Sequence, residues 1–241
     1  MEKAILTAGV LAIPTLILVI GFKLTGRKVE WVPLLWAGFA CLVYFLLLRS
    51  RGELPSPAFL DELDRNWFGK TLSIAGTIAM LYFLPRVGFL DAGVTWKQNE
   101  GSLKPVIIAA AVVVLSMTFA SYAFGPSPNT SVENLLWQAT MPGIDEELFM
   151  RGLLLLLLHQ AFGKGLNIWG AETGWGFWLV TVTFGLLHGA TIEGSDVDID
   201  ISVTMATGFM GFILAWMRER TGSLVVPVLF HNVSNVAQAF V

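Results

Sequence analysis

Long apolar blocks separated by short polar connectors make up most of this chain of 241 residues. A helix crosses a bilayer with about 20 apolar residues, within a range of about 17–25. Eight blocks approach this length and predict eight transmembrane helices. They are Ala4–Phe22, Trp31–Leu48, Phe68–Leu84, Val106–Phe124, Leu148–Phe162, Trp175–Gly189, Ile201–Met217 and Leu224–Val241. The pattern therefore predicts an all-α, polytopic membrane protein.

The third block, Phe68–Leu84, is the least apolar of the eight. Lys70 lies near its start, and Ser73 and Thr77 add polar atoms within it. A charged side chain inside a membrane span costs several kcal/mol. Seven spans are therefore the alternative to eight.

The connectors carry prolines, glycines and charges. Arg49–Asn66 contains two prolines, and within this connector the segment Ala58–Trp67 predicts a short amphipathic helix. Gly88–Pro105 joins the third and fourth spans, and Gly125–Asn134 precedes the fifth. No internal repeat divides the chain, so residues 1–241 are expected to form a single membrane-embedded domain.

Composition supports the membrane class and narrows the partners. Hydrophobic residues make up 55% of the chain and charged residues 14%, whereas soluble domains carry about 25% charged residues. A formal net charge of −3 gives no reason to expect a nucleic-acid partner. A single cysteine, Cys41, excludes a disulfide within one chain. The first apolar block is too long for a signal-peptide core, so we expect it to be retained as a helix.

Charged residues at the start of the fifth span are the first indication of chemistry. Asp145, Glu146 and Glu147 stand together, and Arg151 follows four residues later. A structural interpretation is available, because Pro142 suits the first turn of a helix and acids there complement the helix dipole. Glu147 and Arg151 would then form an i,i+4 ion pair. One acid would satisfy that interpretation and three exceed it, so a functional role is an equal alternative.

Two histidines and an asparagine lie within later apolar blocks. His188 ends the sixth span, one turn after Phe184, and a lone histidine of this kind is more often structural than catalytic. His231 and Asn235 share one face of the last helix at i,i+4 spacing, with Asn232 beside them. Polar side chains can join membrane helices, but this pair on one face favours a polar cavity.

The predicted topology places these groups on one side of the membrane. The fifth span begins there with Glu146, the sixth returns there at His188, and the last ends there beyond His231. A glutamate that takes a proton from water beside a histidine is a general base, and a second histidine with an asparagine can supply oxyanion donors. The same carboxylate and two histidines are also a sufficient ligand set for catalytic zinc.

Two other polar features have simpler interpretations. The acidic segment Glu193–Asp200 lacks the glycine and terminal glutamate of an EF-hand, so a solvated loop is expected. His159, at the end of the leucine run, is interpreted as an interfacial residue.

Three ordered motifs resemble those of a known family, the CPBP family of CAAX prenyl endopeptidases and bacteriocin-processing relatives, also called ABI proteins. The motifs are Glu146-Glu147-x-x-x-Arg151, Phe184-x-x-x-His188 and His231-x-x-x-Asn235. The stretch Arg218–His231 also resembles the lead-in to the family's last motif. The resemblance covers Met141–Asn235, and upstream of it only the sequence Gly-Val-Thr-Trp from Gly93 echoes a family loop.

The resemblance implies an intramembrane endopeptidase with eight helices around a catalytic cavity. Residues 1–140 would supply N-terminal helices, and residues 141–241 would form the catalytic core. Glu146 and His188 would activate water, and His231 and Asn235 would stabilise the oxyanion. The remaining two motif residues, Glu147 and Arg151, would pair and orient the site.

The resemblance does not decide whether the reaction uses a metal, but it implies which partners the protein has. The family is commonly described as metalloproteases, so Zn²⁺ held by Glu146, His188 and His231 stands beside a metal-free mechanism. The partners would be membrane lipid and a peptide or prenylated protein substrate. The expected location is the prokaryotic cell membrane, as a multi-pass protein.

Two other functions compete with proteolysis. A non-catalytic member of the same family would be a bacteriocin self-immunity protein or a scaffold. The presence of every candidate catalytic residue argues against it, because an inactive homologue would be free to lose them. A small transporter with a proton relay would also place acids in the membrane, but the chain shows no inverted pair of halves.

Overall fold

The computed structural model of the protein describes residues 2–124, 128–193 and 196–241. The fold is mostly helical, with 70% of the residues in helices and little sheet. Three helical segments in the described ranges are long and apolar enough to cross a membrane, namely Trp31–Leu48, Leu103–Ala123 and Ile201–Thr221. The predicted helical membrane class is confirmed, and three of the expected spans meet both criteria.

Except at the start of the fifth predicted span, the helices begin and end close to the expected positions. Asn66 and Asp200 cap two of them, since their side chains accept hydrogen bonds from the N–H groups of Gly69 and Val203, both at 3.0 Å. In chain order the helices are α1 (Glu2–Leu24), α2 (Trp31–Leu48), α3 (Ala58–Asp61), α4 (Trp67–Phe83), α5 (Leu103–Phe124), α6 (Val132–Glu147), the π-helix η1 (Leu148–Leu154), α7 (Leu155–Phe162), α8 (Trp175–Gly189), α9 (Ile201–Thr221) and α10 (Val225–Ala239).

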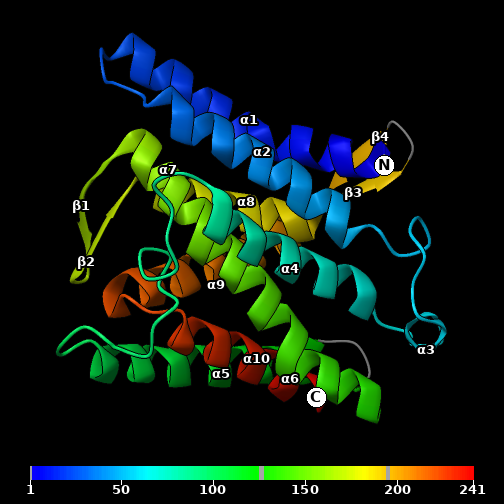
Figure 1. The fold of residues 1–241 in the computed structure, drawn as a ribbon. Helices are drawn as coiled ribbons and strands as arrows, with labels where there is room; N and C mark the ends of the chain where they lie inside the picture. The colour runs from blue at the N-terminus through cyan, green and yellow to red at the C-terminus, as the bar shows by residue number, and fades with distance from the viewer. Residues whose placement is uncertain (1, 125–127, 194–195) are drawn as a thin grey trace.

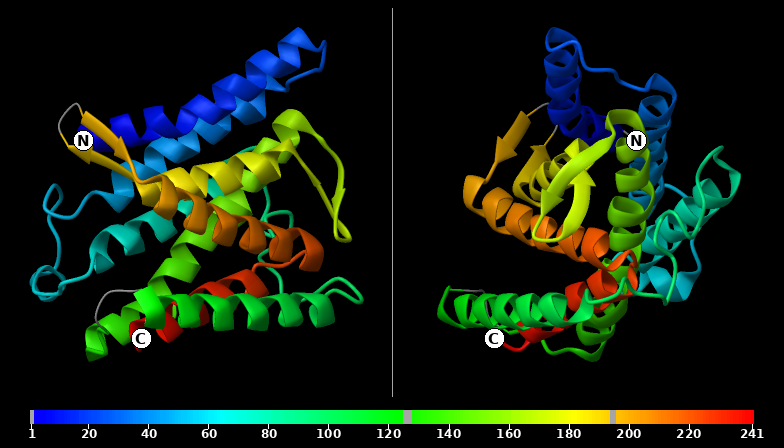
Figure 2. Two further views of the ribbon diagram at one scale, coloured as in Figure 1. Left: turned by 180° about the vertical axis from the view of Figure 1, so that it is seen from behind. Right: turned by 90° about the vertical axis from the view of Figure 1, so that its left-hand side faces the viewer.

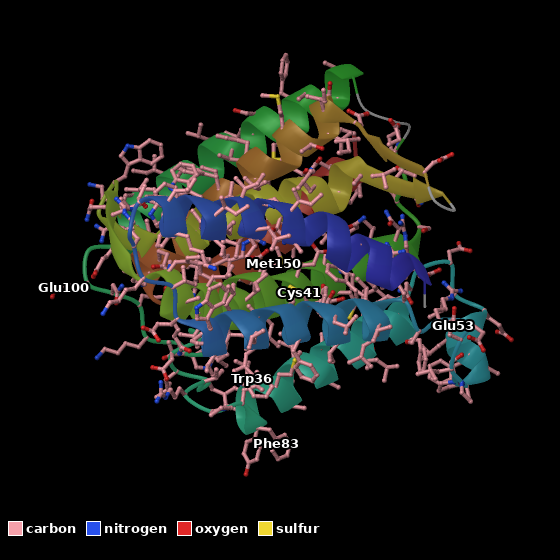
Figure 3. The ribbon with its side chains drawn as sticks, turned by 90° about the horizontal axis from the view of Figure 1, so that it is seen from above. Trp36, Cys41, Glu53, Phe83, Glu100 and Met150 are labelled. Carbon is pink, nitrogen blue, oxygen red and sulfur yellow. The ribbon has the colours of Figure 1, made fainter. Side chains whose placement is uncertain are left out.

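One long helical segment connects two edges of the molecule. Figure 1 shows α1 beside α2 along one edge and α5 beside α10 along the other. The segment α6–η1–α7 runs diagonally between these edges and packs on α2, α4, α8 and α10 (Figures 1 and 2). Seen from above, Met150 of η1 lies near the centre, and Phe83 at the end of α4 projects outward (Figure 3). Their exposed fractions, 0% and 77%, agree with these positions.

The charged residues of the fifth predicted span lie inside this long segment and not at its start. The helix begins at Val132, where the Ser131 side chain accepts a hydrogen bond from the N–H of Asn134 at 3.3 Å. Asp145, Glu146 and Glu147 therefore lie more than three turns from the helix N-terminus, where its dipole no longer favours acids. The prediction that Pro142 begins the helix is wrong, because Pro142 lies within α6.

A contact with α10 accommodates the proline within α6. Proline has no N–H and its ring disturbs the preceding turn of a helix. The next N–H, that of Gly143, donates a hydrogen bond to the Asn232 side-chain oxygen on α10 at 2.8 Å. The Asn232 amide group in turn donates to the carbonyl of Thr140 at 3.4 Å. Asn232 therefore joins α10 to the disturbed turn of α6.

The connectors depart from the prediction in two places. The helix expected at Ala58–Trp67 is a single turn, because the guanidinium of Arg51 takes up the carbonyls that a longer helix would use, those of Asp61, Leu63, Asp64 and Arg65. Two antiparallel hairpins also interrupt the all-α pattern. They are β1 (Lys164–Ile168) with β2 (Ala171–Gly174), and β3 (Ala190–Glu193) with β4 (Asp196–Ile199).

The hairpins project from opposite sides of the helices (Figure 1). The predicted loop Glu193–Asp200 supplies β4, whose four residues are exposed. Residues 194–195 of that loop lie outside the described part of the chain. Charged and polar residues had favoured a loop here, but cross-strand backbone hydrogen bonds form regardless of solvent-exposed side chains.

The corner between α9 and α10 holds the long connector that precedes α5. Gly222 ends α9 in the left-handed conformation, with φ 75°. The buried Arg218 donates to the carbonyls of Asp91 and Ala92, and the N–H of Leu224 donates to the carbonyl of Gly93. These bonds give the Arg218–His231 stretch a structural role before the last helix begins.

Replacing Gly143 by alanine should destabilise the protein. A Cβ at this position would lie 2.5 Å from Asn232 Oδ1 and 2.7 Å from the carbonyl oxygen of Val228, so α6 and α10 would have to separate. We expect a loss of about 1–3 kcal/mol, measured as a lower thermal unfolding midpoint in detergent. Gly38→Ala on α2 is the matched control, because a Cβ there has no atom within 4 Å. Equal midpoints in the two variants would contradict the close approach.

Candidate active site

The predicted site residues of three helices surround the carboxylate of Glu146. Its Oε2 atom lies 3.7 Å from Nε2 of His188 on α8 and 3.9 Å from Nε2 of His231 on α10. The Glu146 side chain is 12% exposed. Its Oε2 is buried and has no hydrogen-bond partner in the described part of the chain. One carboxylate oxygen is thus held between two imidazoles and left free.

The other nitrogen of each imidazole fixes its tautomer. Nδ1 of His188 lies 2.9 Å from the carbonyl oxygen of Phe184, and Nδ1 of His231 lies 2.8 Å from Oε1 of Glu147. Because a carbonyl and an ionised carboxylate can only accept, each Nδ1 carries a proton. In the neutral ring Nε2 then carries the lone pair, so both rings can take up a proton on the side of Glu146.

Glu147 and Arg151 orient His231 from behind. Oε1 of Glu147 also accepts a hydrogen bond from NH1 of Arg151 at 3.0 Å, and all three side chains are nearly or fully buried. Arg151 donates further to the carbonyl of Gly211 at 3.1 Å, and its guanidinium lies 4.2 Å from the ring centroid of Phe184. The i,i+4 ion pair expected from the sequence is present.

Lys70 joins the site from α4, and sequence reasoning missed it. Its Nζ lies 2.7 Å from Oε1 of Glu146 and 2.9 Å from Oδ2 of Asp145. Asp145 also accepts hydrogen bonds from the Tyr44 hydroxyl at 2.8 Å and from Ser73 Oγ at 2.6 Å. The sequence feature that could have revealed this contact is Lys70, with Ser73 one turn later, in an otherwise apolar block. A lysine inside a membrane span pairs with a buried anion, so its presence there indicates an acidic partner on another helix.

Glu146 lines a cavity of about 460 Å³. Glu146, His188, His231 and Asn235 all line it, so the structure brings the predicted catalytic side chains to one space. The neighbouring Asn232, by contrast, is buried against α6. The rest of the lining combines amides, one guanidinium and apolar side chains, including Asn129, Asn134, Gln138, Gln238, Arg65, Met117, Phe184 and Met210.

Glu133 fixes the rim of this cavity. Its carboxylate accepts hydrogen bonds from the N–H groups of Arg65 at 2.9 Å and Asp64 at 3.2 Å. The Arg65 guanidinium donates to the Asn134 side-chain oxygen at 2.6 Å. The connector before α4 is thereby tied to the start of α6.

The donor types at the site suit zinc, but their arrangement does not. Tetrahedral zinc with bonds of about 2.0–2.1 Å separates its ligand atoms by about 3.4 Å. The separations here are 3.7 and 3.9 Å, and the Lys70 ammonium already occupies the second oxygen of Glu146. Across the described ranges no group of three His, Cys, Asp or Glu side chains is arranged to hold a metal ion.

His159 belongs to a different cluster. It is buried, and its Nε2 lies 3.4 Å from Oε1 of Glu219 on α9, while Lys164 pairs with the other oxygen of Glu219 at 2.6 Å. His159 thus pairs with an acid on another helix, and its place at the membrane interface stays a prediction.

Comparison with known proteins agrees with the motifs. Residues 128–237 match the family model described as Type II CAAX prenyl endopeptidase Rce1-like. No curated protein and no solved structure matches the chain. The matched range contains all six motif residues that were proposed for catalysis and orientation. This match to residues 128–237 supports the resemblance to CAAX prenyl endopeptidases that the three motifs indicate.

Proposed function

We propose that this protein is an intramembrane endopeptidase in which Glu146 is the general base for water attack on a peptide bond. The observation that carries the proposal is the Oε2 atom of Glu146, which is buried without a hydrogen-bond partner between two imidazoles that line the same cavity as Glu146. A carboxylate in this state can take a proton from a water molecule placed beside it.

The proposed reaction begins with that water. Glu146 removes a proton with the help of Nε2 of His188, and the water oxygen forms a bond to the carbonyl carbon of the substrate. The resulting oxyanion needs donors placed where its charge develops. His231, when its ring carries both protons, donates from Nε2 to the oxyanion while its Nδ1 donates to the Glu147 carboxylate. Asn235 donates from its side-chain amide.

The second half of the reaction returns the proton. Glu146, now protonated, gives it to the leaving nitrogen as the carbon–nitrogen bond breaks. The products leave as a carboxylic acid and an amine, which together keep both protons of the water, and Glu146 is again ionised and ready for the next water. Arg151 stays paired with Glu147 throughout and keeps His231 in one orientation.

The family name and the cavity suggest the substrate. We propose a peptide or a prenylated protein that approaches from the lipid, because the matching family is described as CAAX prenyl endopeptidases. Amide side chains around the cavity suit peptide groups, and its apolar side chains suit a hydrophobic neighbour. A non-catalytic immunity protein or scaffold is the outcome to expect if no cleavage depends on Glu146.

The proposed setting is the prokaryotic cell membrane, with eight helical segments in the bilayer. These are α1, α2, α4, α5, the continuous α6–η1–α7, α8, α9 and α10. Burial of the charged groups supports this placement, since Lys70, Asp145, Glu147 and Arg151 are all compensated by partners inside the helices.

Replacing Glu146 by glutamine should abolish cleavage while leaving the fold intact. Glutamine keeps the shape of the side chain but cannot accept the proton, so we expect kcat to fall by about 100-fold or more. The assay is cleavage of a farnesylated CAAX peptide by purified protein. The control is Glu100→Gln, an exposed acid at the periphery of the molecule (Figure 3). Activity equal to wild type in Glu146→Gln would refute the proposed mechanism.

Cleavage should survive metal chelation. The proposed chemistry uses only side chains, so treatment with EDTA and then 1,10-phenanthroline is expected to leave kcat unchanged. Metal analysis of the same sample provides the control. Activity lost on chelation and restored by added zinc would show instead that Glu146, His188 and His231 serve as metal ligands.

Two neighbouring asparagines should separate catalysis from stability. Asn235→Ala removes an oxyanion donor from the cavity, so we expect a loss of about 100-fold in kcat with an unchanged thermal midpoint. Asn232→Ala leaves the N–H of Gly143 without its partner, which costs about 1–3 kcal/mol of folding stability. The paired measurement is kcat with detergent-phase thermal unfolding. The opposite pattern would reverse the two assignments.

A further inference from the structure

We infer that Lys70 is a positioning residue for the catalytic carboxylate, holding Glu146 by Oε1 so that Oε2 stays free toward the cavity. This inference rests on the proposed function of Glu146.

Lys70 acts from behind the site. It is 8% exposed, and its Nζ lies 2.7 Å from Oε1 of Glu146. The described residues that line the cavity include Glu146 but not Lys70. Lys70 therefore has no contact with a substrate in that cavity, and any effect on the reaction passes through Glu146.

The ammonium group is itself held from several directions. Oδ2 of Asp145 accepts a second hydrogen bond from it at 2.9 Å, and the ring of Trp137 lies 5.9 Å from Nζ. Tyr44 on α2 and Ser73 on α4 donate to Asp145 and fix that carboxylate in turn. These contacts restrict the otherwise flexible Lys70 side chain, so that its ammonium group stays directed toward Glu146.

The charge of Lys70 also bears on whether Glu146 is ionised. The charged and titratable neighbours of Glu146 come from every helix around it. They are Tyr44 from α2, Lys70 from α4, Asp145 and Glu147 from α6, Arg151 from η1, His188 from α8 and His231 from α10. Without the ammonium, Asp145 and Glu146 would be adjacent carboxylates with no cation between them. An added negative charge nearby favours the protonated acid, and a protonated Glu146 cannot accept a proton from water.

A simpler alternative gives Lys70 no part in catalysis. In that case Lys70 would only neutralise Asp145 as a buried ion pair, and Glu146 would lie near it without depending on it. The two interpretations differ when both members of that pair are made neutral, because the alternative then predicts recovery and the inference does not.

The test compares Lys70→Met, Asp145→Asn and the double variant with wild type. Lys70→Met is expected to lower kcat by about 100-fold with little change in KM, because the base loses its fixed orientation. The double variant removes the unpaired buried charge and should regain thermal stability while its kcat stays as low as in Lys70→Met. Lys70→Arg, which keeps the charge, should recover part of kcat. Lys97→Met, an exposed lysine, serves as the matched control.

A second readout does not depend on a substrate. Dicyclohexylcarbodiimide reacts with protonated carboxyl groups in apolar surroundings, and mass spectrometry can locate the adduct on Glu146. In wild type the nearby ammonium favours the ionised form, so labelling should stop at lower pH than in Lys70→Met. The Glu146→Gln protein identifies labelling at Asp145 and Glu147.

The outcomes separate this inference from the proposed function. Wild-type kcat and an unchanged labelling profile in Lys70→Met would overturn the inference, as would full recovery of kcat in the double variant. Cleavage that persists in Glu146→Gln would refute the proposed function instead. In that event the labelling profile would still report whether Lys70 controls the protonation of Glu146.

Discussion

Burial of three consecutive carboxylates on one helix sets the arrangement of the helices around it. Successive residues of a helix point about 100° apart, so Asp145, Glu146 and Glu147 cannot all share one partner. Lys70 of α4 pairs with both Asp145 and Glu146. Asp145 is also held by Tyr44 of α2 and Ser73 of α4, and Glu147 is compensated by Arg151 and by His231 of α10. An uncompensated buried charge costs several kcal/mol, so moving any of these helices away would be costly. The core around α6 and η1 is therefore specified by charge as much as by apolar packing.

The three carboxylates differ in their partners and in their access to the cavity. Both oxygens of Asp145 are hydrogen-bonded, whereas Glu146 and Glu147 each have one bonded oxygen and one buried oxygen without a partner. Of the three, Glu146 lines the cavity and Glu147 is fully buried behind His231. The π-helical turn that follows supports this difference, because it brings Arg151 onto Glu147 within a segment whose residues Phe149–Leu154 are all buried. π-Helical turns are rare in proteins as a whole, and many of those that occur lie at functional sites.

Features that depend on neighbours in sequence were predictable, and features that depend on distant partners were not. Apolar block lengths located the helices, and i,i+4 spacing located the pair of Glu147 with Arg151. Lys70 weakened the prediction that its own segment is a membrane span. A hydropathy pattern evaluates each position alone and contains no information about an acid 76 residues away. The start of α6 was misplaced for the same reason, since the partner that makes Pro142 tolerable within the helix is Asn232 on α10. The two hairpins were not predicted, because backbone pairing in short, exposed strands requires no distinctive pattern of side chains.

The helices that carry the two histidines are short. α8 and α10 have 15 residues each, which corresponds to about 22 Å at 1.5 Å per residue, against about 30 Å for the hydrocarbon core of a bilayer. A membrane meets such a mismatch by thinning around the protein. In the proposed membrane placement, lipid around α8 and α10 would be compressed, and the headgroup region would dip toward the cavity lined by Glu146. A substrate anchored in the leaflet, as proposed, would then present its bond at that depth without being drawn out of the lipid.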